Sequence, residues 1–365
     1  MIVLEDLLRQ VVARGASDIH FKVGCLPILR LNTRLIDMEG AALTKADVER
    51  IGRSLVSDKQ WESFQGRGEL DIAYLSEGVG RFRTNMFRQR GLVGVVMRHV
   101  KTMIPDFKEL GLPAILEKIS LAERGIVIVS GATGCGKSTT LASMINFINI
   151  NVRRHIITVE DPIEYIHSDD KSVIDQREVG IDTRTFAAAL RFVMRQDPDV
   201  IMVGEMRDRE SFSAMLYAAD VGRLAMTTLH SPDAAQVMLR VMDFFPASDR
   251  EQVRMQLAAN LVAVVCQRLL PRKDREGMVP AVEIMLGTPS VRKFIRENKL
   301  EKLSDAIQDG RDEGMQTLNQ SLVELVKASV VTEQDALDDS PNRESLKMNL
   351  QGIYLDESRK ILGSD

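Results

Sequence analysis

Apolar positions in the first hundred residues switch between helical spacing and short extended runs. Helical spacing at Leu4, Leu8 and Val11, ending at Gly15, predicts an N-terminal helix, and a second helical stretch covers residues 44–64. The extended runs predict strands at 18–23, 28–35, 71–75, 81–88 and 94–99. We therefore expect a small α+β domain over residues 1–104, followed by a linker with Pro and Gly at 105–113.

The pattern changes from residue 123 onward. Short, continuous apolar runs now alternate with helical segments, which is typical of a parallel sheet buried on both faces. Amphipathic helices are expected beyond Pro289, and the polar tail after Asp338 is expected to be held loosely. Residues 114–365 are thus predicted to form an α/β domain with a mainly parallel sheet and a helical C-terminal region. The apolar runs place its strands at 126–129, 156–159, 200–203 and 224–227.

Composition narrows the function further. A formal net charge of −4 gives no general attraction to nucleic acid or an anionic membrane, and 5% aromatic residues are too few for a base-stacking surface. Three cysteines without a Cys-x-x-Cys pair argue against a disulfide framework or a four-cysteine zinc site and favour the cytoplasm. The N-terminus lacks a signal-peptide layout. The most apolar stretch, 257–270, is too short and polar to span a bilayer, so any membrane role is expected through a partner.

A glycine-rich segment follows the first strand of the second domain. Residues 131–138 read GATGCGKS and match the phosphate-binding pattern G-x-x-x-x-G-K-[ST] between a strand and a helix. The glycines let successive N–H groups turn toward phosphate oxygens at a helix N-terminus. We expect Lys137 to reach the β- and γ-phosphates of ATP and Ser138 to ligate Mg²⁺; the alternative is a glycine-rich turn without a ligand. The predicted nucleotide-binding set is Gly131, Ala132, Thr133, Gly134, Cys135, Gly136, Lys137, Ser138 and Thr139.

Polar residues follow each of the other apolar runs. Glu160 and Glu164 come after the run that ends at 159, Glu205 follows the run that ends at 203, and His230 follows the last run. Ligands of open parallel sheets bind beyond the C-terminal ends of the strands. We therefore expect these side chains to converge beside the bound phosphates.

Each of these residues has a functional and a structural interpretation. Glu205 is predicted to orient the attacking water, the alternative being a salt bridge to Arg207 or Arg209. The carboxylates of the segment Glu160–Glu164 either hold Mg²⁺ through water and set the polarity of the site or are solvated loop residues. His230 could sense the γ-phosphate or relay strain to the next subunit, the alternative being a purely structural role.

These segments together resemble a known family. Four segments resemble the motifs of type II/IV secretion-superfamily ATPases. The Walker A motif corresponds to GATGCGKSTT, the Asp box to ITVEDPIEY, the Walker B motif to DPDVIMVGEMRD and the His box to TTLHSPDA. ASDIHF and GRFRTNMFRQR resemble their PAS-like N-terminal domain, and TPSVRKFIREN resembles a C-terminal motif of the pilus retraction ATPases, the PilT/PilU group. The resemblance covers nearly the whole chain. It implies a PAS-like domain, a RecA-like P-loop ATPase domain and a hexameric motor that retracts type IV pili.

The resemblance also implies roles and partners. It makes Glu205 the catalytic glutamate, Glu160–Glu164 the Asp box and His230 the second His-box histidine. Arg83 and Arg98 correspond to N-terminal-domain arginines that reach the γ-phosphate, although on spacing alone both read as exposed strand residues. The implied partners are further copies of the chain, an inner-membrane pilus platform protein and a paralogous retraction ATPase. The implied location is the cytoplasmic side of the inner membrane.

Two departures from the family pattern and three alternative functions remain. Arg223 replaces the first His-box histidine, and Cys135 stands in the loop where serine is usual. A thiol beside a lysine and a helix N-terminus is expected to have a lowered pKa and to make the ATPase sensitive to thiol reagents. The alternatives are a pilus-assembly or secretion ATPase, a RecA-like enzyme on nucleic acid, and a non-hydrolysing regulator of a sister motor. Retraction is favoured over assembly because assembly ATPases usually carry a further N-terminal domain and a four-cysteine zinc element.

Overall fold

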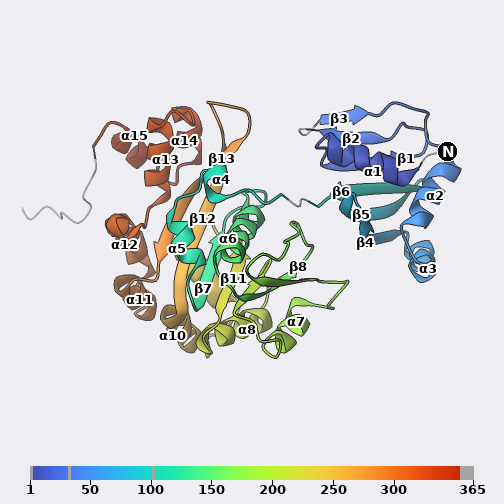
Figure 1. Ribbon diagram of the computed structural model, residues 1–365. Helices are drawn as coiled ribbons and strands as arrows, with labels where there is room; N and C mark the ends of the chain where they lie inside the picture. Colours follow the sequence, from blue (N-terminus) through green and yellow to red (C-terminus); the bar gives the residue numbers. More distant parts are fainter. Residues whose placement is uncertain (1–2, 32–33, 101–102, 354–365) are drawn as a thin grey trace, which may run out of the picture. The chain divides into compact units, whose positions relative to one another are not determined.

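The computed structural model describes residues 3–31, 34–100 and 103–353 (Figure 1). These residues form two compact units. One comprises the chain up to residue 103 together with 162–166, and the other comprises 104–161 and the chain from 167 onward. No helix in these described ranges is long and apolar enough to cross a membrane.

The N-terminal unit is an antiparallel six-stranded sheet with helices against one face. The strand order is β3-β2-β1-β6-β5-β4. Alternate residues such as Ile19, Phe82 and Met97 are fully buried in a core shared with the helices, so the expected α+β domain is confirmed. The helices are α1 (Leu4–Ala13), α2 (Lys45–Ser54) and α3 (Asp58–Arg67), and the strands are β1 (Asp18–Lys22), β2 (Ile28–Leu31), β3 (Arg34–Asp37), β4 (Glu69–Ser76), β5 (Gly80–Gln89) and β6 (Leu92–His99).

Two predicted elements of this unit are each divided in the structure. The helical stretch 44–64 becomes α2 and α3, because Ser57 starts a new helix through a capping box with Gln60. The run 28–35 becomes the antiparallel pair β2 and β3, with Leu31 opposite Arg34, while residues 32–33 of that run lie outside the described residues. Both predictions missed a local break in the element that an apolar pattern does not encode.

The second unit is built on a seven-stranded sheet. Its order is β13-β12-β7-β11-β10-β8-β9, and every neighbouring pair is parallel except β12 and β13. The expected mainly parallel α/β sheet is therefore confirmed. The strands are β7 (Gly125–Ser130), β8 (His155–Glu160), β9 (Val173–Glu178), β10 (Val200–Val203), β11 (Leu224–Leu229), β12 (Leu261–Pro271) and β13 (Met278–Leu286).

Helices bury both faces of this sheet, which explains its continuous apolar strands. In β7, Ile126 and Ile128 pack in one apolar cluster, whereas Val127 and Val129 pack in a cluster on the other face. The first cluster includes residues of α7 to α12, and the second includes residues of α4 to α6. The helices are α4 (Phe107–Leu110), α5 (Ile115–Ser120), α6 (Lys137–Asn151), α7 (Phe186–Val193), α8 (Arg209–Asp220), α9 (Ala234–Asp243), α10 (Arg250–Asn260), α11 (Pro289–Arg296), α12 (Leu303–Asp309), α13 (Leu318–Lys327), α14 (Glu333–Asp339) and α15 (Arg343–Leu350).

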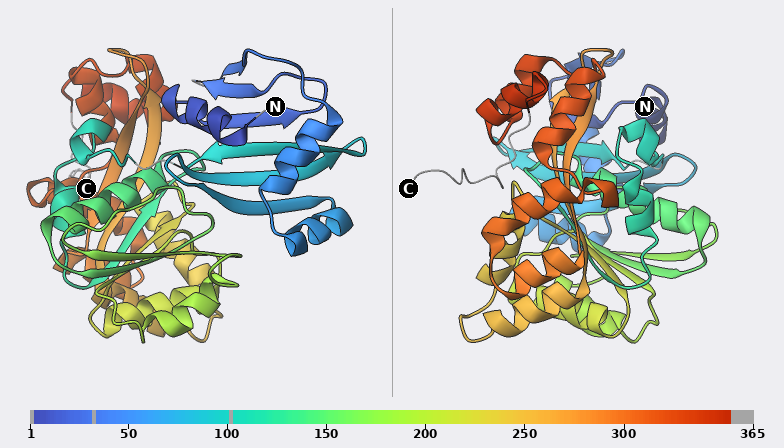
Figure 2. Two further views of the ribbon diagram at one scale, coloured as in Figure 1. Left: turned by 45° about the vertical axis from the view of Figure 1, so that its right-hand side comes forward. Right: turned by 90° about the vertical axis from the view of Figure 1, so that its left-hand side faces the viewer.

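The C-terminal helices are packed more firmly than the sequence predicted. Leu318, Leu322 and Leu346 of α13 and α15 form an apolar cluster with Leu270 and Val279 of β12 and β13. In Figure 2 these red helices lie beside the orange strands. The expectation of a loose tail after Asp338 is wrong for residues 343–350, which form α15 with Leu346 fully buried. Residues 354–365 lie outside the described residues.

Candidate nucleotide site

The glycine-rich loop joins the end of β7 to the start of α6. Gly131, Gly134 and Gly136 have φ values of 142°, 80° and 91°, a region that side chains with a Cβ disfavour. A Cβ on Gly131 would also lie 2.4 Å from the carbonyl oxygen of Gln267. Backbone conformation and close packing therefore both require glycine at the start of the loop.

Lys137 is the first residue of α6 and is folded back over the loop. Its side chain is buried, and Nζ donates to the carbonyl oxygens of Gly131 and Ala132 at 2.9 Å each. Ser138 follows it with an exposed side chain, and Thr139 is half-buried. The loop therefore presents an ammonium group and a hydroxyl at the N-terminus of a 15-residue helix.

The sheet brings four strand ends to one edge beside this loop. In register, Ser130 at the end of β7 pairs with Leu229 of β11. Val203 of β10 pairs with Thr227 of β11 and with Val159 of β8. All four strands are parallel, so the polar residues that follow them lie at the same edge.

A chain of three polar side chains crosses this edge. His230 Nε2 lies 3.2 Å from Glu205 Oε1, and His230 Nδ1 lies 3.4 Å from Lys137 Nζ. An ammonium group only donates, so Nδ1 accepts from Lys137 and the proton on Nε2 faces Glu205. The structure thus links the loop lysine to the strand-end glutamate through one imidazole ring.

Glu205 has a second partner on its other oxygen. Arg207 Nη2 donates to Glu205 Oε2 at 2.8 Å, whereas Arg209 pairs with Asp249 instead. The hydrogen bond from Arg207 holds the pKa of Glu205 below its usual value, against the effect of burial, and the charges of Arg207 and Lys137 act in the same direction. The salt bridge considered for Glu205 therefore exists, and it keeps the carboxylate ionised beside His230.

Glu160 is a buried carboxylate on the neighbouring strand end. Its Oε1 accepts from Thr158 Oγ1 at 2.7 Å and from Gln176 Nε2 at 3.0 Å. Its backbone lies against Gly204, where an added Cβ would be 3.5 Å from the Cα of Glu160. Glu164 is exposed and belongs to the segment 162–166, which the division of the chain assigns to the N-terminal unit. The two carboxylates of the predicted Asp box therefore differ in environment, since Glu160 is buried and Glu164 is exposed.

Arg83 and Arg98 lie in the N-terminal unit on adjacent strands. They are directly opposite each other in the β5–β6 pairing, and both side chains are exposed. Arg98 Nε donates to Asp18 Oδ1 at 2.8 Å. Their contact with a nucleotide stays a prediction.

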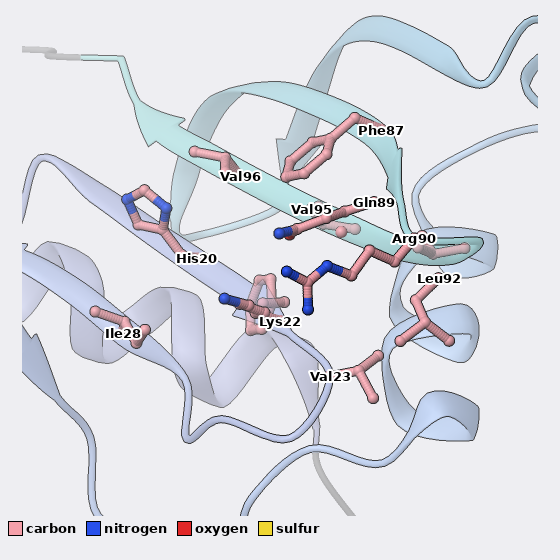
Figure 3. A pocket seen from close by; sticks show the side chains of 13 residues that line it. His20, Lys22, Val23, Ile28, Phe87, Gln89, Arg90, Leu92, Val95 and Val96 are labelled. Atoms are coloured by element: carbon pink, nitrogen blue, oxygen red, sulfur yellow. The ribbon is translucent and has the colours of Figure 1, made fainter.

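The N-terminal unit also contains a pocket of about 300 Å³ (Figure 3). Its lining side chains include the basic or polar His20, Lys22 and Arg90 and the apolar Ile28 and Leu92. None of its 13 lining residues is acidic, so it offers no carboxylate to orient water or to hold Mg²⁺. The chemistry of phosphate transfer is therefore better supplied by the second unit.

Comparison with known proteins places the chain in a family. A family model described as "Type II/IV secretion system protein" matches residues 81–340. The chain belongs to this family. It is 40% identical over 347 residues to the type IV pilus ATPase PilU of Pseudomonas aeruginosa, covering 95% of this chain and 91% of the relative. It is also 40% identical over 333 residues to the retraction ATPase PilT of the same organism, covering 91% and 96%.

A solved structure supports the same assignment. The pilus retraction motor PilT with bound ADP superimposes with a TM-score of 0.89 at 40% identity, covering 95% of this chain and 99% of that one. This type II/IV secretion system protein is therefore a nucleotide-binding ATPase with the predicted arrangement of an N-terminal and a P-loop domain.

Three polar residues of this secretion ATPase support the site and were not predicted. Ser130 Oγ donates to Ser231 O at 2.8 Å and accepts from Ser231 N at 2.9 Å, which fixes the backbone beside His230. Gln176 on β9 supports Glu160, and Gln267 on β12 contacts the phosphate loop. For Ser130 and Gln267 the available sequence signal was a polar residue at the end of or within an apolar run, whereas Gln176 lies in the mostly polar segment 173–178 and had no such signal.

The environment of Cys135 differs from the expectation. Burial raises the pKa of its thiol above the ordinary value, and the opposing effect of Lys137 is smaller. The expected low pKa is therefore wrong, because the thiol is buried, and the effect of burial exceeds that of Lys137 and of the backbone N–H groups beside it.

Arg223 does not take part in the strand-end group. It lies just before β11 at the amino end of that strand, whereas His230 follows the carboxyl end. Its guanidinium is within 3.6 Å of Asp197 and Asp199. Arg223 therefore makes ion pairs at the amino ends of the strands, away from the polar residues at their carboxyl ends.

Proposed function

We propose that this chain is a motor ATPase that uses ATP hydrolysis to retract type IV pili. The observation that carries the proposal is the chain of contacts from Lys137 through His230 to Glu205 at the strand ends. Its 40% identity to PilU and PilT over more than nine-tenths of its own length supports the same motor activity.

The contacts around Lys137 suggest how the site responds to ATP. Its ammonium group bonds two loop carbonyls and contacts His230. A γ-phosphate is a charged and therefore stronger acceptor, so ATP draws Lys137 away from these partners. His230 then loses the donor on Nδ1 and its hold on Glu205 changes. In this way binding of the γ-phosphate changes the hydrogen bonding of Glu205, the carboxylate that orients water.

The remaining residues are proposed to hold Mg²⁺ and to stabilise the negative charge of the phosphates. Ser138, with its exposed hydroxyl at the start of α6, fits the single protein ligand of a Mg²⁺ ion that would neutralise the β- and γ-phosphates. Glu160 is proposed to set the polarity of the site, and Glu164 to act with it as the Asp box. Arg83 and Arg98 are proposed to stabilise the transferring phosphoryl group.

The family also suggests an assembly and a location. We propose a hexamer that works in the cytoplasm at the inner membrane, against a pilus platform protein and with a paralogous retraction ATPase. Within each subunit we propose domains at 1–104 and 114–365 with a connection at 105–113. That connection contains α4, whose Phe107 is buried in the core of the second unit.

Phosphate-release and nucleotide-binding assays test the ATPase part of this proposal. We expect Glu205→Gln to lower kcat by about 10²–10⁴-fold while ATP affinity changes less than threefold, because only the water-orienting group is lost. Lys137→Ala is expected to lose both binding and turnover. Glu251→Gln, an exposed residue in the first turn of α10, is the matched control. Wild-type turnover in Glu205→Gln would remove that residue from its role.

A cellular experiment tests retraction itself. Deletion of the gene is expected to leave excess pili that no longer retract, and the Lys137→Ala variant should not restore retraction. Loss of pili after deletion would instead identify an assembly ATPase. Normal retraction after deletion would identify an accessory partner of another motor.

A further inference from the structure

Gln267 is a buried amide in the middle of β12, next to the phosphate loop. Its side chain is 2% exposed in a strand whose neighbours Val265 and Leu270 are fully buried. An amide in such surroundings is costly unless both of its polar ends are bonded. Here both ends bond the nucleotide-binding segment. Nε2 donates to the carbonyl oxygen of Cys135, and Oε1 accepts from Thr140 Oγ1 at 2.9 Å.

The bond to Cys135 fixes one peptide plane of the loop. In a trans peptide, the carbonyl of residue 135 and the N–H of Gly136 point in opposite directions. Anchoring the Cys135 carbonyl on the side of β12 therefore turns the Gly136 N–H toward the opposite side. That is the orientation a phosphate cradle needs, since its N–H groups face the ligand and its carbonyls face the protein.

The fit between the loop and β12 is close over several residues. A Cβ on Gly131 would lie 2.4 Å from the Gln267 carbonyl oxygen, and a Cβ on Gly136 would lie 3.1 Å from Gln267 Nε2. The second contact, to Thr140, holds the first turn of α6 through the same amide. One side chain thus ties the loop and the helix that follows it to a neighbouring strand.

We propose that Gln267 is a positioning residue for nucleotide binding, which holds the loop in the conformation that accepts the phosphates of ATP. The proposal rests on the proposed nucleotide site and extends it to a strand that carries none of its predicted residues. Only an amide of this length both donates to Cys135 and accepts from Thr140. Methionine keeps the length without either bond, and an ionised glutamate keeps the acceptor but cannot donate.

The test is the equilibrium affinity of the full-length protein for ATP, measured with a fluorescent ATP analogue, together with steady-state kinetics. We expect Q267M to raise Kd and KM by about tenfold with kcat changed less than threefold. A loop that must be ordered on binding weakens the binding of the substrate and of the transition state alike. Q267E should bind ATP at least as weakly as Q267M does. Q316L is the matched control, because Gln316 also donates to a buried backbone carbonyl, that of Val282, but does not contact the loop.

Thermal unfolding separates positioning from folding. Wild-type ATP affinity in Q267M, with only a lower unfolding temperature, would overturn the proposal. If Q267M does not fold, T140V decides: it removes only the hydroxyl that holds Gln267 Oε1, and binding weakened by about threefold supports the proposal whereas wild-type affinity overturns it. Weak binding by Lys137→Ala with normal binding by Q267M would refute this inference alone, and a wild-type chain that binds no ATP would refute the nucleotide site itself.

Discussion

Glu283 makes the stability of the second unit depend on pH. It lies on β13, where its Oε1 accepts from Ala234 N, the first residue of α9, at 2.8 Å, and the backbone N–H of Leu318, the first residue of α13, also favours its charged form. The side chain is only partly exposed, and burial raises its pKa from 4.5 to about 7, against the lowering effect of these two N–H donors. The carboxyl group therefore bonds the N-terminus of α9 at a position where its charged form is disfavoured.

The sign of the effect follows from the two pKa values. The folded state holds the proton up to a pH of about 7 and the unfolded state only up to about 4.5, so stability is lost as pH rises through this window. At 1.36 kcal/mol for each pH unit, the loss reaches about 3 kcal/mol, an upper bound because the side chain is not fully enclosed. Glu283→Gln removes the titration but keeps an acceptor for the N–H groups. The variant should match the wild type near pH 5 and become relatively more stable toward pH 8.

Urea unfolding at pH 5, 6, 7 and 8 measures this difference. Far-UV circular dichroism, at fixed protein concentration without nucleotide, reports mainly the larger second unit. The single tryptophan, Trp61, lies on α3 of the N-terminal unit, so its fluorescence should show the same transition in both proteins. Glu276→Gln, an exposed residue between β12 and β13, is the control. Parallel stability curves for Glu283→Gln and wild type across this range would refute the reasoning.

Three further predictions concern the site. Arg207→Ala removes the hydrogen bond that lowers the pKa of Glu205, so the acidic limb of the pH profile of kcat should move to higher pH; an unmoved limb would contradict this. Gly131→Ala should abolish ATP binding in calorimetry, since its Cβ would lie 2.4 Å from the Gln267 carbonyl oxygen, and binding of normal strength would speak against that packing. Cys135 should react with an alkylating reagent at least tenfold more slowly in the folded, nucleotide-free protein than in urea, as followed by mass spectrometry, because its thiol is buried with a raised pKa; equal rates would show that the thiol is accessible.

The parallel part of the sheet and the gathering of its strand ends could be predicted because both follow from burial. A strand covered on both faces has to be apolar throughout, so β7, β8, β10 and β11 were visible as continuous runs. Parallel strands end at a common edge, so the positions of Glu205 and His230 relative to the loop followed without any knowledge of distances.

The strands β12 and β13 could not be recognised in the same way. The run 257–270 crosses from the end of α10 into β12, so neither helical nor strand spacing holds over its length. Gln267 and Arg268 read as interruptions of that run. Their partners, the carbonyls of Cys135 and Asp339, are 132 and 71 residues away in the chain. Local patterns do not carry such contacts, and the same limit explains why the burial of Cys135 was missed.

A buried polar residue inside an apolar strand is nevertheless a usable signal, because leaving it unpaired costs about 1–3 kcal/mol. Ser130, Thr158 and Gln267 are all buried in central strands, and each bonds a segment of the nucleotide site. Thr227 limits the rule, since its hydroxyl is buried in β11 with no hydrogen-bond partner among the described residues. The signal therefore selects positions for mutagenesis. What separates Gln267 from Thr227 is the pair of bonds that its amide makes to the loop and the helix which follows it.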